Sequence, residues 1–180
     1  MKAYLDIEET ELLESAAISM RDKLLVRLLA RLGCRISEAL ALEVKDIDFS
    51  QNTVTIEHLK SHIKLACPSC GASLGKSHVF CPRCGKRVKE AVSKEKEHRK
   101  VRNLPLDLNT ANILKDYVSR GGPISKNGKM LLFGINRSRA WQIIKECANK
   151  AGLPQLMNPE TGKVHNVSPH KLRDAFAVHA

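Results

Sequence analysis

The sequence predicts an α+β domain that is mainly helical and contains a small antiparallel sheet. Leucines recur at one-turn spacing between residues 21 and 32, which indicates a buried helix. Residues 53–57 alternate and are rich in β-branched side chains, which is typical of a strand. At 180 residues the chain can form one domain with a real core and carry a small appendage.

The amino-terminal part is predicted to form two helices. Asp6 followed by Glu9 is a capping pattern for a helix over about 7–18. The apolar face of this helix is expected to consist of Leu12, Leu13 and Ala16. The leucine-rich helix follows over about 21–32, and Gly33 is suited to end it because glycine readily adopts a left-handed conformation.

Arg35 is the first candidate functional residue. It falls in the short turn before a third helix, which Ser37 can cap. A guanidinium held between two packed helices is a rigidly aimed cation, whereas the common alternative is a surface arginine at a helix boundary. Glu38 is expected to hold the arginine or to cap the backbone rather than to take part in chemistry.

The small sheet is predicted from two separated stretches, an outgoing strand over 53–57 and a return strand over 100–106. About forty residues lie between them. Residues 60–102 contain twelve Lys or Arg and three Glu, a net charge of +9. Because this basic block adjoins a strand pattern and a metal motif, we interpret it as a nucleic-acid contact region rather than a solvated tail.

The stretch between the strands carries a specific metal motif. It reads Cys-Pro-Ser-Cys from residue 67 and Cys-Pro-Arg-Cys-Gly from residue 81. Two such pairs supply four thiolates, the tetrahedral set that zinc prefers. The motif therefore predicts a structural zinc ribbon, closed to substrate, with four ligands: Cys67, Cys70, Cys81 and Cys84. An iron site and two disulfides are the alternatives, and metal binding is expected to drive the folding of so small a unit.

The remaining chain is predicted to contain two amphipathic helices before the last stretch. The first covers about 109–119, and the second begins after Asn136 and covers about 137–151. The core face of the second helix is expected to comprise Trp141, Ile144, Ala148 and Ala151. Residues 130–133 are expected to form a buried segment, and residues 159–167 a polar loop.

The last stretch combines an imidazole and a guanidinium at a predicted helix start. Ser168 is a good N-cap, and Pro169 suits the first helical position. His170 and Arg173 then share one face near the helix N-terminus, which attracts anions. An imidazole can exchange a proton and a guanidinium can grip two phosphate oxygens, so the pattern indicates phosphate chemistry.

Two segments carry a family resemblance: Gly-Cys-Arg-Ile-Ser-Glu from residue 33 and Ser-Pro-His-Lys-Leu-Arg-Asp-Ala-Phe-Ala-Val-His from residue 168. They resemble the two signature boxes of the tyrosine recombinases, the phage-integrase and Xer-type family. The resemblance covers nearly the whole chain and implies the tyrosine-recombinase catalytic-domain fold. The cysteine-rich insertion departs from the family pattern and divides the chain into a catalytic domain over 1–60 and 97–180 and a zinc ribbon over 61–96.

The resemblance implies site-specific DNA recombination and integration, in which strands are cut and rejoined through a 3′-phosphotyrosyl intermediate without a metal or nucleotide cofactor. In this reaction Arg35 and Arg173 would clamp phosphate oxygens, and His170 would donate a hydrogen bond or transfer a proton. Lys60 is our candidate for protonating the leaving 5′ oxygen. Because the insertion shifts the register of the hairpin, Lys96 and Lys100 remain alternatives.

The resemblance also indicates parts that this sequence does not contain. In the family a further His or Trp and the nucleophilic tyrosine follow the second box, and a DNA-clamp domain precedes the first. Tyr4 and Tyr117 are each better explained by packing. The chain is therefore expected to be a fragment that cannot form the covalent DNA link by itself.

Charge and cysteine usage bound the partners and the compartment. With a net charge of +11, the expected partner is double-stranded DNA, and self-assembly on DNA is implied by the resemblance. No apolar run is long enough to span a membrane, and the metal-type cysteine spacing favours a reduced, cytoplasmic protein. The competing interpretation is a non-catalytic zinc-ribbon DNA-binding protein or an integrase relic.

Overall fold

The computed structural model describes residues 2–75 and 77–179, without the side chains of residues 58–64 and 93–100. The chain divides into two compact units, residues 1–56 with 102–180 and residues 57–101. We call the first the main unit and the second the ribbon unit.

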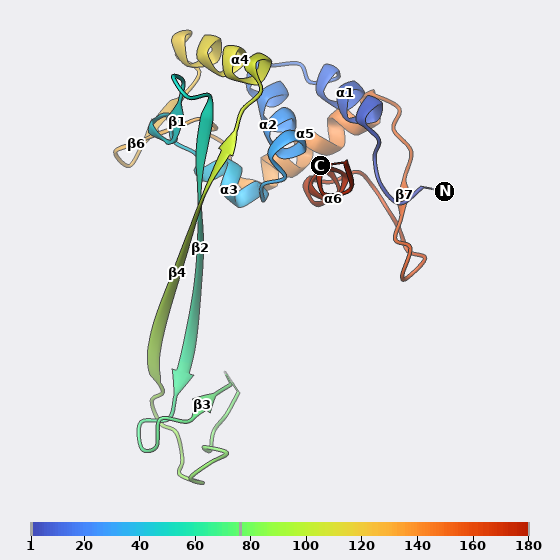
Figure 1. The fold of residues 1–180 in the computed structure, drawn as a ribbon. Coiled ribbons are helices and arrows are strands. Elements are labelled where there is room, and N and C mark those ends of the chain that lie inside the picture. Colours follow the sequence, from blue (N-terminus) through green and yellow to red (C-terminus); the bar gives the residue numbers. More distant parts are fainter. Residues whose placement is uncertain (1, 76, 180) are drawn as a thin grey trace. The chain divides into compact units, whose positions relative to one another are not determined.

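The main unit is mainly helical and has small antiparallel pairings, which confirms the predicted fold class (Figure 1). Its helices are α1 (Ile7–Ser15), α2 (Met20–Leu32), α3 (Ile36–Ala41), the 3-10 helix η1 (Val44–Asp46), α4 (Leu108–Ser119), α5 (Arg137–Lys150) and α6 (Pro169–His179). Its short strands are β1 (Ile47–Asp48), β5 (Ile124–Lys126), β6 (Lys129–Leu131), β7 (Leu156–Met157) and β8 (Val164–His165). Antiparallel partners are β1 with the start of β2, β5 with β6, and β7 with β8.

Two long strands lead from the main unit into the ribbon unit. They are β2 (Thr53–Ala66) and β4 (Val92–Pro105), and they pair with each other. The predicted strands 53–57 and 100–106 lie at the main-unit ends of this hairpin. Within the main unit, Thr55 Oγ1 donates a hydrogen bond to Asn103 Oδ1 at 3.0 Å, which links the two strands through their side chains.

Helix α2 is the centre of the main unit. It contacts α1, α3, α4, α5 and α6 (Figure 1). Its five leucines are buried, as the periodicity predicted: Leu24, Leu25, Leu28, Leu29 and Leu32. Because these side chains face several directions around the helix, α2 supports both sequence segments that carry the candidate site.

Three of the predicted helix ends are confirmed, at Asp6, Gly33 and Asn136. Asp6 accepts a hydrogen bond from the Glu9 N–H, and Glu9 accepts one from the Asp6 N–H, which completes a capping box. Gly33 ends α2 in a left-handed conformation with φ of 55°. Asn136 caps α5 by accepting a hydrogen bond from the Arg139 N–H at 2.8 Å.

Two expectations about helical faces are wrong. Helix α1 ends at Ser15, because Ser19 caps the next helix and the chain must turn between them. Leu12 is 53% exposed, whereas its neighbour Leu13 is buried. Trp141 is 41% exposed rather than in the core, because the buried face of α5 runs through Ala140, Ile144 and Cys147 instead.

Three local expectations are also corrected. Ser37 lies inside α3, and Arg35 occupies the N-cap position, where its N–H donates to the Glu38 carboxylate. Met130 is exposed because it lies in the β5–β6 hairpin, although Leu132 and Phe133 are buried. The predicted loop 159–167 contains β8, which pairs with β7.

The ribbon unit has a very small apolar cluster. Its buried members are Cys67, Leu74 and Cys81. Strand β3 (Ser73–Leu74) pairs with the end of β2, in the register Leu65 with Leu74 and Ala66 with Ser73. The predicted ribbon 61–96 lies within this unit.

Candidate functional site

A glycine and a phenylalanine explain how the two signature segments come together. Helix α6, from the second segment, contacts α2, which the first segment follows. An added Cβ on Gly33 would lie 2.2 Å from Phe176 Cδ1, so only glycine leaves room for the ring at this turn. Arg35 follows the turn two residues later and is carried toward the start of α6.

Three of the four predicted catalytic side chains line one hollow of about 910 Å³ in the main unit: Arg35, His170 and Arg173. The fourth candidate, Lys60, has a side chain outside the described residues, as do Lys96 and Lys100. Three further cationic side chains line the same hollow: Arg137, Lys145 and Lys171. The hollow is therefore strongly basic, which suits a phosphate or another anion.

Arg35 is held by a buried carboxylate. The Glu38 side chain is only 2% exposed and accepts hydrogen bonds from the Arg35 N–H at 2.8 Å and Nη1 at 3.1 Å. Arg102, on β4, donates through Nη2 to Glu38 Oε2 at 2.9 Å, the oxygen that also accepts from the Arg35 N–H. Burial alone would raise the pKa of Glu38, but these hydrogen bonds and the two guanidinium charges lower it below its ordinary value.

Arg102 is a residue of the site region that sequence reasoning missed. It lies in the predicted return strand, but no spacing in the sequence relates it to Glu38, 64 positions earlier. One feature of the sequence could have indicated such a residue: Glu38 lies on the inner face of a short helix, and a buried carboxylate needs a cationic partner. The identity of that partner depends on the packing of β4 beside α3.

His170 is at the exposed rim of the hollow. Its side chain is 77% exposed, and Nδ1 lies 3.4 Å from Asp174 Oδ1, one turn along α6. Asp174 also lies 3.4 Å from the Lys171 ammonium. Ser168 caps α6 as predicted, because its Oγ accepts a hydrogen bond from the Lys171 N–H. The hollow thus opens at a helix N-terminus, with an imidazole that a carboxylate can orient.

Helix α5 supplies a further wall of the hollow. Arg137, Trp141 and Lys145 follow one another at one-turn intervals, and all three line it. Arg137 and Lys145 are both exposed. The exposure of Trp141 follows from the same periodicity, since it lies between these two cations.

A thiol, that of Cys34, also lines the hollow, but its protonation state makes it unsuitable as a nucleophile. Cys34 lines it and is fully buried. Burial raises the pKa of this thiol to about 12, so it stays protonated at neutral pH. Cys34 and Cys147 are both buried thiols in the main unit.

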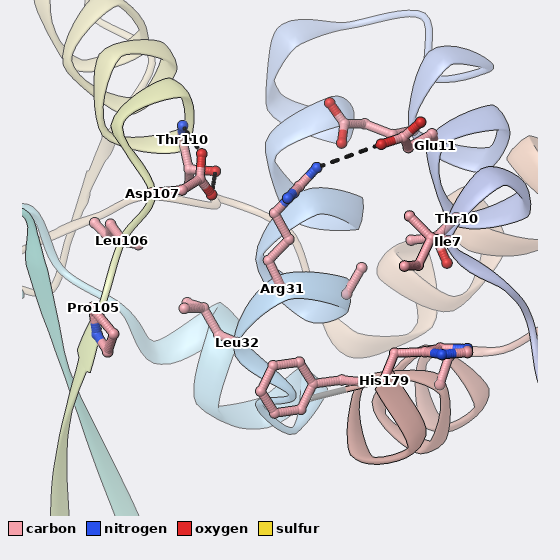
Figure 2. Close-up of a pocket in the computed structure, with 14 residues that line it drawn as sticks. Ile7, Thr10, Glu11, Arg31, Leu32, Pro105, Leu106, Asp107, Thr110 and His179 are labelled. Carbon is pink, nitrogen blue, oxygen red and sulfur yellow. Dashed lines mark hydrogen bonds and ion pairs between the residues drawn. The ribbon is translucent and has the colours of Figure 1, made fainter.

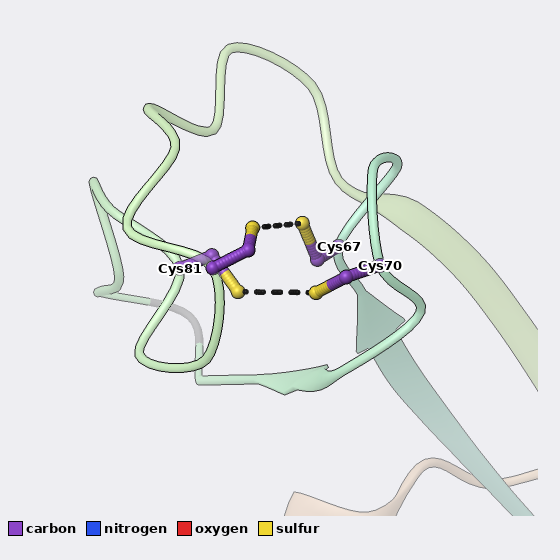
Figure 3. A group of neighbouring side chains, drawn as sticks. Cys67, Cys70 and Cys81 are labelled. Atoms are coloured by element: carbon purple, nitrogen blue, oxygen red, sulfur yellow. Dashed lines mark hydrogen bonds between the residues drawn. The ribbon is translucent and has the colours of Figure 1, made fainter.

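The candidate metal centre lies in the ribbon unit. The sulfur atoms of Cys67, Cys70, Cys81 and Cys84 all lie within 4.8 Å of one another, in a group that could hold a metal ion. Figure 3 shows Cys67 and Cys70 across from Cys81. The Sγ–Sγ distances are 3.8 Å for Cys67–Cys84 and 3.6 Å for Cys70–Cys81. A tetrahedral Zn–S distance of about 2.3 Å corresponds to sulfurs about 3.8 Å apart. All four are free thiols, so the two-disulfide alternative is not found.

A second hollow, of about 380 Å³, lies elsewhere in the main unit. Residues of α1, α2, α4, α6 and the end of β4 line it (Figure 2). Its polar lining includes Arg31, which pairs with Glu11 at 3.9 Å, and His179, whose Nε2 lies 3.0 Å from the Leu5 carbonyl oxygen. No predicted catalytic residue with a described side chain lines it.

The helices in the described part of the chain include none long and apolar enough to cross a membrane.

Comparison with known structures identifies the fold. A XerA recombinase structure aligns with 99% of this chain and 50% of its own, with a TM-score of 0.62 and 21% identity. The Tn1549 transposon integrase, in complex with transposon right-end DNA, aligns with 99% of this chain and 53% of its own, with a TM-score of 0.58 and 15% identity. The main unit therefore has the fold of the tyrosine-recombinase catalytic domain.

Sequence comparison agrees. The model of the phage integrase family matches residues 4–74. The tyrosine recombinase XerD of Neisseria meningitidis serogroup B is 27% identical over 168 residues, 89% of this chain and 41% of its own length. The XerD of Corynebacterium glutamicum is 29% identical over 162 residues, 90% of this chain and 40% of its own. The chain is thus similar to tyrosine recombinases and spans about 40% of the length of these curated relatives.

Proposed function

We propose that this chain is the catalytic part of a site-specific DNA recombinase that cuts and rejoins strands through a 3′-phosphotyrosyl intermediate. The observation that carries the proposal is the convergence of Arg35, His170 and Arg173 on one basic hollow, from segments more than 130 positions apart. The relatives named as tyrosine recombinases support the same reaction class.

The reaction needs stabilisation of charge on the non-bridging phosphate oxygens. Arg35 and Arg173 would bind these oxygens, because a guanidinium offers paired N–H donors to a phosphate. Glu38 and Arg102 would keep Arg35 in position, since a buried carboxylate between two guanidiniums restricts their rotamers. His170 would donate a hydrogen bond or transfer a proton from the exposed rim, with Asp174 orienting its ring.

The leaving 5′ oxygen needs a proton, and we propose Lys60 on β2 as its donor. Lys60 follows the predicted strand segment 53–57 at close to the offset of the family's catalytic lysine. Lys96 and Lys100, on the return strand, stay the alternatives. Substitution of each lysine by Arg would separate them, because arginine keeps the charge but does not release a proton near neutral pH.

The nucleophile is proposed to come from the segment that follows the second box in the family. Tyr117 is an unsuitable nucleophile, because it is buried and its hydroxyl donates to the carbonyl oxygens of Gly122 and Leu132. Tyr4, like Tyr117, is not among the residues that line the basic hollow. By itself, the chain is therefore expected to bind DNA without forming the covalent link.

The four-cysteine group is proposed to bind Zn²⁺ as a structural ion. Four thiolates at these distances fit its tetrahedral coordination. With every position filled by protein, the ion would fix the ribbon unit and leave no position open to substrate. Double-stranded DNA is the proposed partner, and self-assembly on DNA is proposed for the whole protein.

A covalent-adduct assay tests the proposal. A chain continued through the segment after the second box should form a protein–DNA adduct on a nicked suicide substrate, and Arg173→Ala should abolish it. Arg139→Ala is the matched control, because Arg139 lies on α5, pairs with Glu146 at 2.9 Å and does not line the hollow. An adduct that survives Arg173→Ala, or no adduct on varied DNA sites, favours the non-catalytic DNA-binding alternative.

The hollow itself can be tested in the 180-residue chain. Trp141 is the single tryptophan and lines the hollow, so its fluorescence reports an anion bound there. Vanadate, a phosphate mimic, should change this signal in the parent chain and in Arg139→Ala. Arg35→Ala and Arg173→Ala should each weaken vanadate binding by roughly tenfold or more, since charge-assisted hydrogen bonds contribute about 1.5–3 kcal/mol.

A further inference from the structure

The ribbon unit is built from two turns with the same hydrogen bonds. We call residues 67–71 knuckle 1 and residues 81–85 knuckle 2. In each, the closing glycine donates its N–H to the first cysteine's carbonyl oxygen at 2.9 Å, and both glycines have positive φ, 70° and 69°. The N–H of each first cysteine also donates to the residue five positions later, at 2.8 Å and 2.9 Å. The two knuckles are therefore repeats of one backbone design.

The repeats differ in one pair of equivalent positions. The residue before the first cysteine pairs with the residue six positions after that cysteine. In knuckle 1 this pair is Ala66 with Ser73, and in knuckle 2 it is Phe80 with Arg87. Because a small neutral pair satisfies the backbone in one half, the fold does not require a large aromatic and a cation in the other.

Phe80 and Arg87 share an outward face of the ribbon unit. Neighbouring residues on a strand point to opposite faces, and antiparallel partners point to the same one. Cys81 and Val88 belong to the inner face, since both take part in the small apolar cluster. Phe80 and Arg87 consequently face away from it, and Phe80 is 59% exposed. We call this pair the Phe80–Arg87 platform.

The surroundings of the platform are basic. Residues 81–90 carry four cationic side chains and one acidic residue, Glu90: Arg83, Lys86, Arg87 and Lys89. All four cationic residues are exposed, and among the described residues none of them forms an ion pair. The equivalent stretch of knuckle 1, residues 67–76, contains one charged residue, Lys76. Charge and aromatic surface are thus concentrated on the same half of the ribbon.

We propose that the Phe80–Arg87 platform is a DNA-contact surface separate from the basic hollow. The four cations would contact phosphates, and the Phe80 ring would pack against a deoxyribose or a base in a groove. A second copy of the chain is the less suitable partner, because the chain has a net charge of +11 and would repel its own kind. The inference rests on the proposed function only in taking DNA as the substrate.

The test transplants the knuckle 1 pair into knuckle 2, as Phe80→Ala with Arg87→Ser in the full chain. Metal content should stay at the parent stoichiometry, because Ala and Ser already occupy these positions in the other repeat. Affinity for a fluorescein-labelled DNA duplex, measured by anisotropy, should fall roughly tenfold, the usual loss for an aromatic contact with a nucleotide. The slope of log affinity against log salt should shrink by about 1, for one lost phosphate contact.

A second variant protects the test against misfolding. Arg83→Ser places the knuckle 1 residue, Ser69, at the same position of knuckle 2 and leaves the platform's backbone pairing intact. It should also reduce the salt slope by about 1, whereas Ser69→Ala, the matched control, should leave affinity and slope unchanged.

The inference would be overturned if DNA affinity and salt slope were unchanged both in Phe80→Ala with Arg87→Ser and in Arg83→Ser. A protein partner would then be the better candidate for this surface. That outcome leaves the proposed function standing, because vanadate binding in the hollow and adduct formation do not involve the platform. Conversely, Arg35→Ala and Arg173→Ala should not change the difference in salt slope between Arg83→Ser and the unsubstituted ribbon, even if they abolish vanadate binding or adduct formation. The two failures are therefore distinguishable.

Discussion

The two units of the chain are stabilised by different means. The main unit encloses a continuous apolar core around α2, with side chains from every helix that contacts it. Among the described side chains, the ribbon unit buries only four: Ala66, Cys67, Leu74 and Cys81. A fully buried leucine contributes about 1.5–3 kcal/mol, so these few small residues cannot offset the chain entropy of the ribbon. Apolar burial therefore suffices to explain the folding of the main unit, whereas the ribbon unit is expected to need the metal proposed for its four cysteines.

Removing the metal should break this comparison most completely. Structural zinc contributes about 10–16 kcal/mol of apparent folding free energy in small domains. A chelator, or Cys81→Ser, should therefore unfold the ribbon unit, seen as collapsed amide dispersion of its residues by NMR, and spare the main unit. Cys147→Ala is the control, because it removes a main-unit cysteine and should leave metal content unchanged. A ribbon unit that keeps its dispersion without metal would contradict the comparison.

A core truncation should have the opposite selectivity. Leu13→Ala is expected to lower the main unit's free energy of unfolding by about 2–5 kcal/mol, because the side chain is fully buried. Leu12→Ala, one position earlier and 53% exposed, should change it by no more than about 0.5 kcal/mol. Denaturant unfolding measures both, and metal content should stay at the parent value. Equal effects of the two substitutions would argue against the observed orientation of α1.

Gly33→Ala sharpens the comparison by testing how the main unit's core aligns its site. The substitution should cost more than about 1 kcal/mol, since it adds left-handed strain to a clash with Phe176. Gly152→Ala reports the strain alone, because Gly152 has φ of +64° and an added Cβ would meet nothing within 4 Å. Only Gly33→Ala should also weaken vanadate binding in the hollow. If both variants lose stability equally, the Phe176 contact is not limiting.

The smallest expected effect is a pH dependence confined to the main unit. The pKa of Glu38 is lower in the folded protein than its ordinary value of 4.5, where burial opposes the shift and the Arg35 and Arg102 contacts prevail. A carboxyl of this kind stabilises the fold above its unfolded pKa and loses that contribution as pH falls through its folded pKa. The parent should therefore lose more stability below about pH 4.5 than Glu38→Gln.

The control for the pH experiment is Glu8→Gln, on the exposed face of α1. It should follow the parent's pH profile in denaturant unfolding. If Glu38→Gln also follows that profile, the carboxylate between Arg35 and Arg102 does not contribute pH-dependent stability.

The sequence predicted those parts of the fold that depend on local chemistry. Residues only a few positions apart determine three such features: the leucine spacing of α2, the caps at Asp6 and Asn136, and the cysteine pairs. Arg35, His170 and Arg173 were placed together only through the family resemblance, because nothing local connects positions 35 and 170. Lys60 stays a prediction, since its side chain is outside the described residues.

The features that could not be predicted depend on which neighbours pack where. Trp141 is large and apolar, as core residues usually are. However, α5 buries Ala140, Ile144 and Cys147 instead, and the indole lines the hollow together with Arg137 and Lys145. The Arg102–Glu38 contact requires β4 to pass beside α3. The hydrophobic periodicity of the two segments does not predict this packing. Whether a charged side chain can be buried depends on a partner that is distant in the sequence, and a single sequence does not reveal which residue this partner is.

The ribbon unit enters and leaves through β2 and β4, which are antiparallel neighbours. Paired strands lie about 4.8 Å apart, a gap that a two-residue turn can close. Such an attachment makes the ribbon an exchangeable cassette: it can be excised, lengthened or swapped for another small module without repacking the helices. A chain with residues 61–96 replaced by a short Asn-Gly turn should accordingly keep the helical core and its anion hollow.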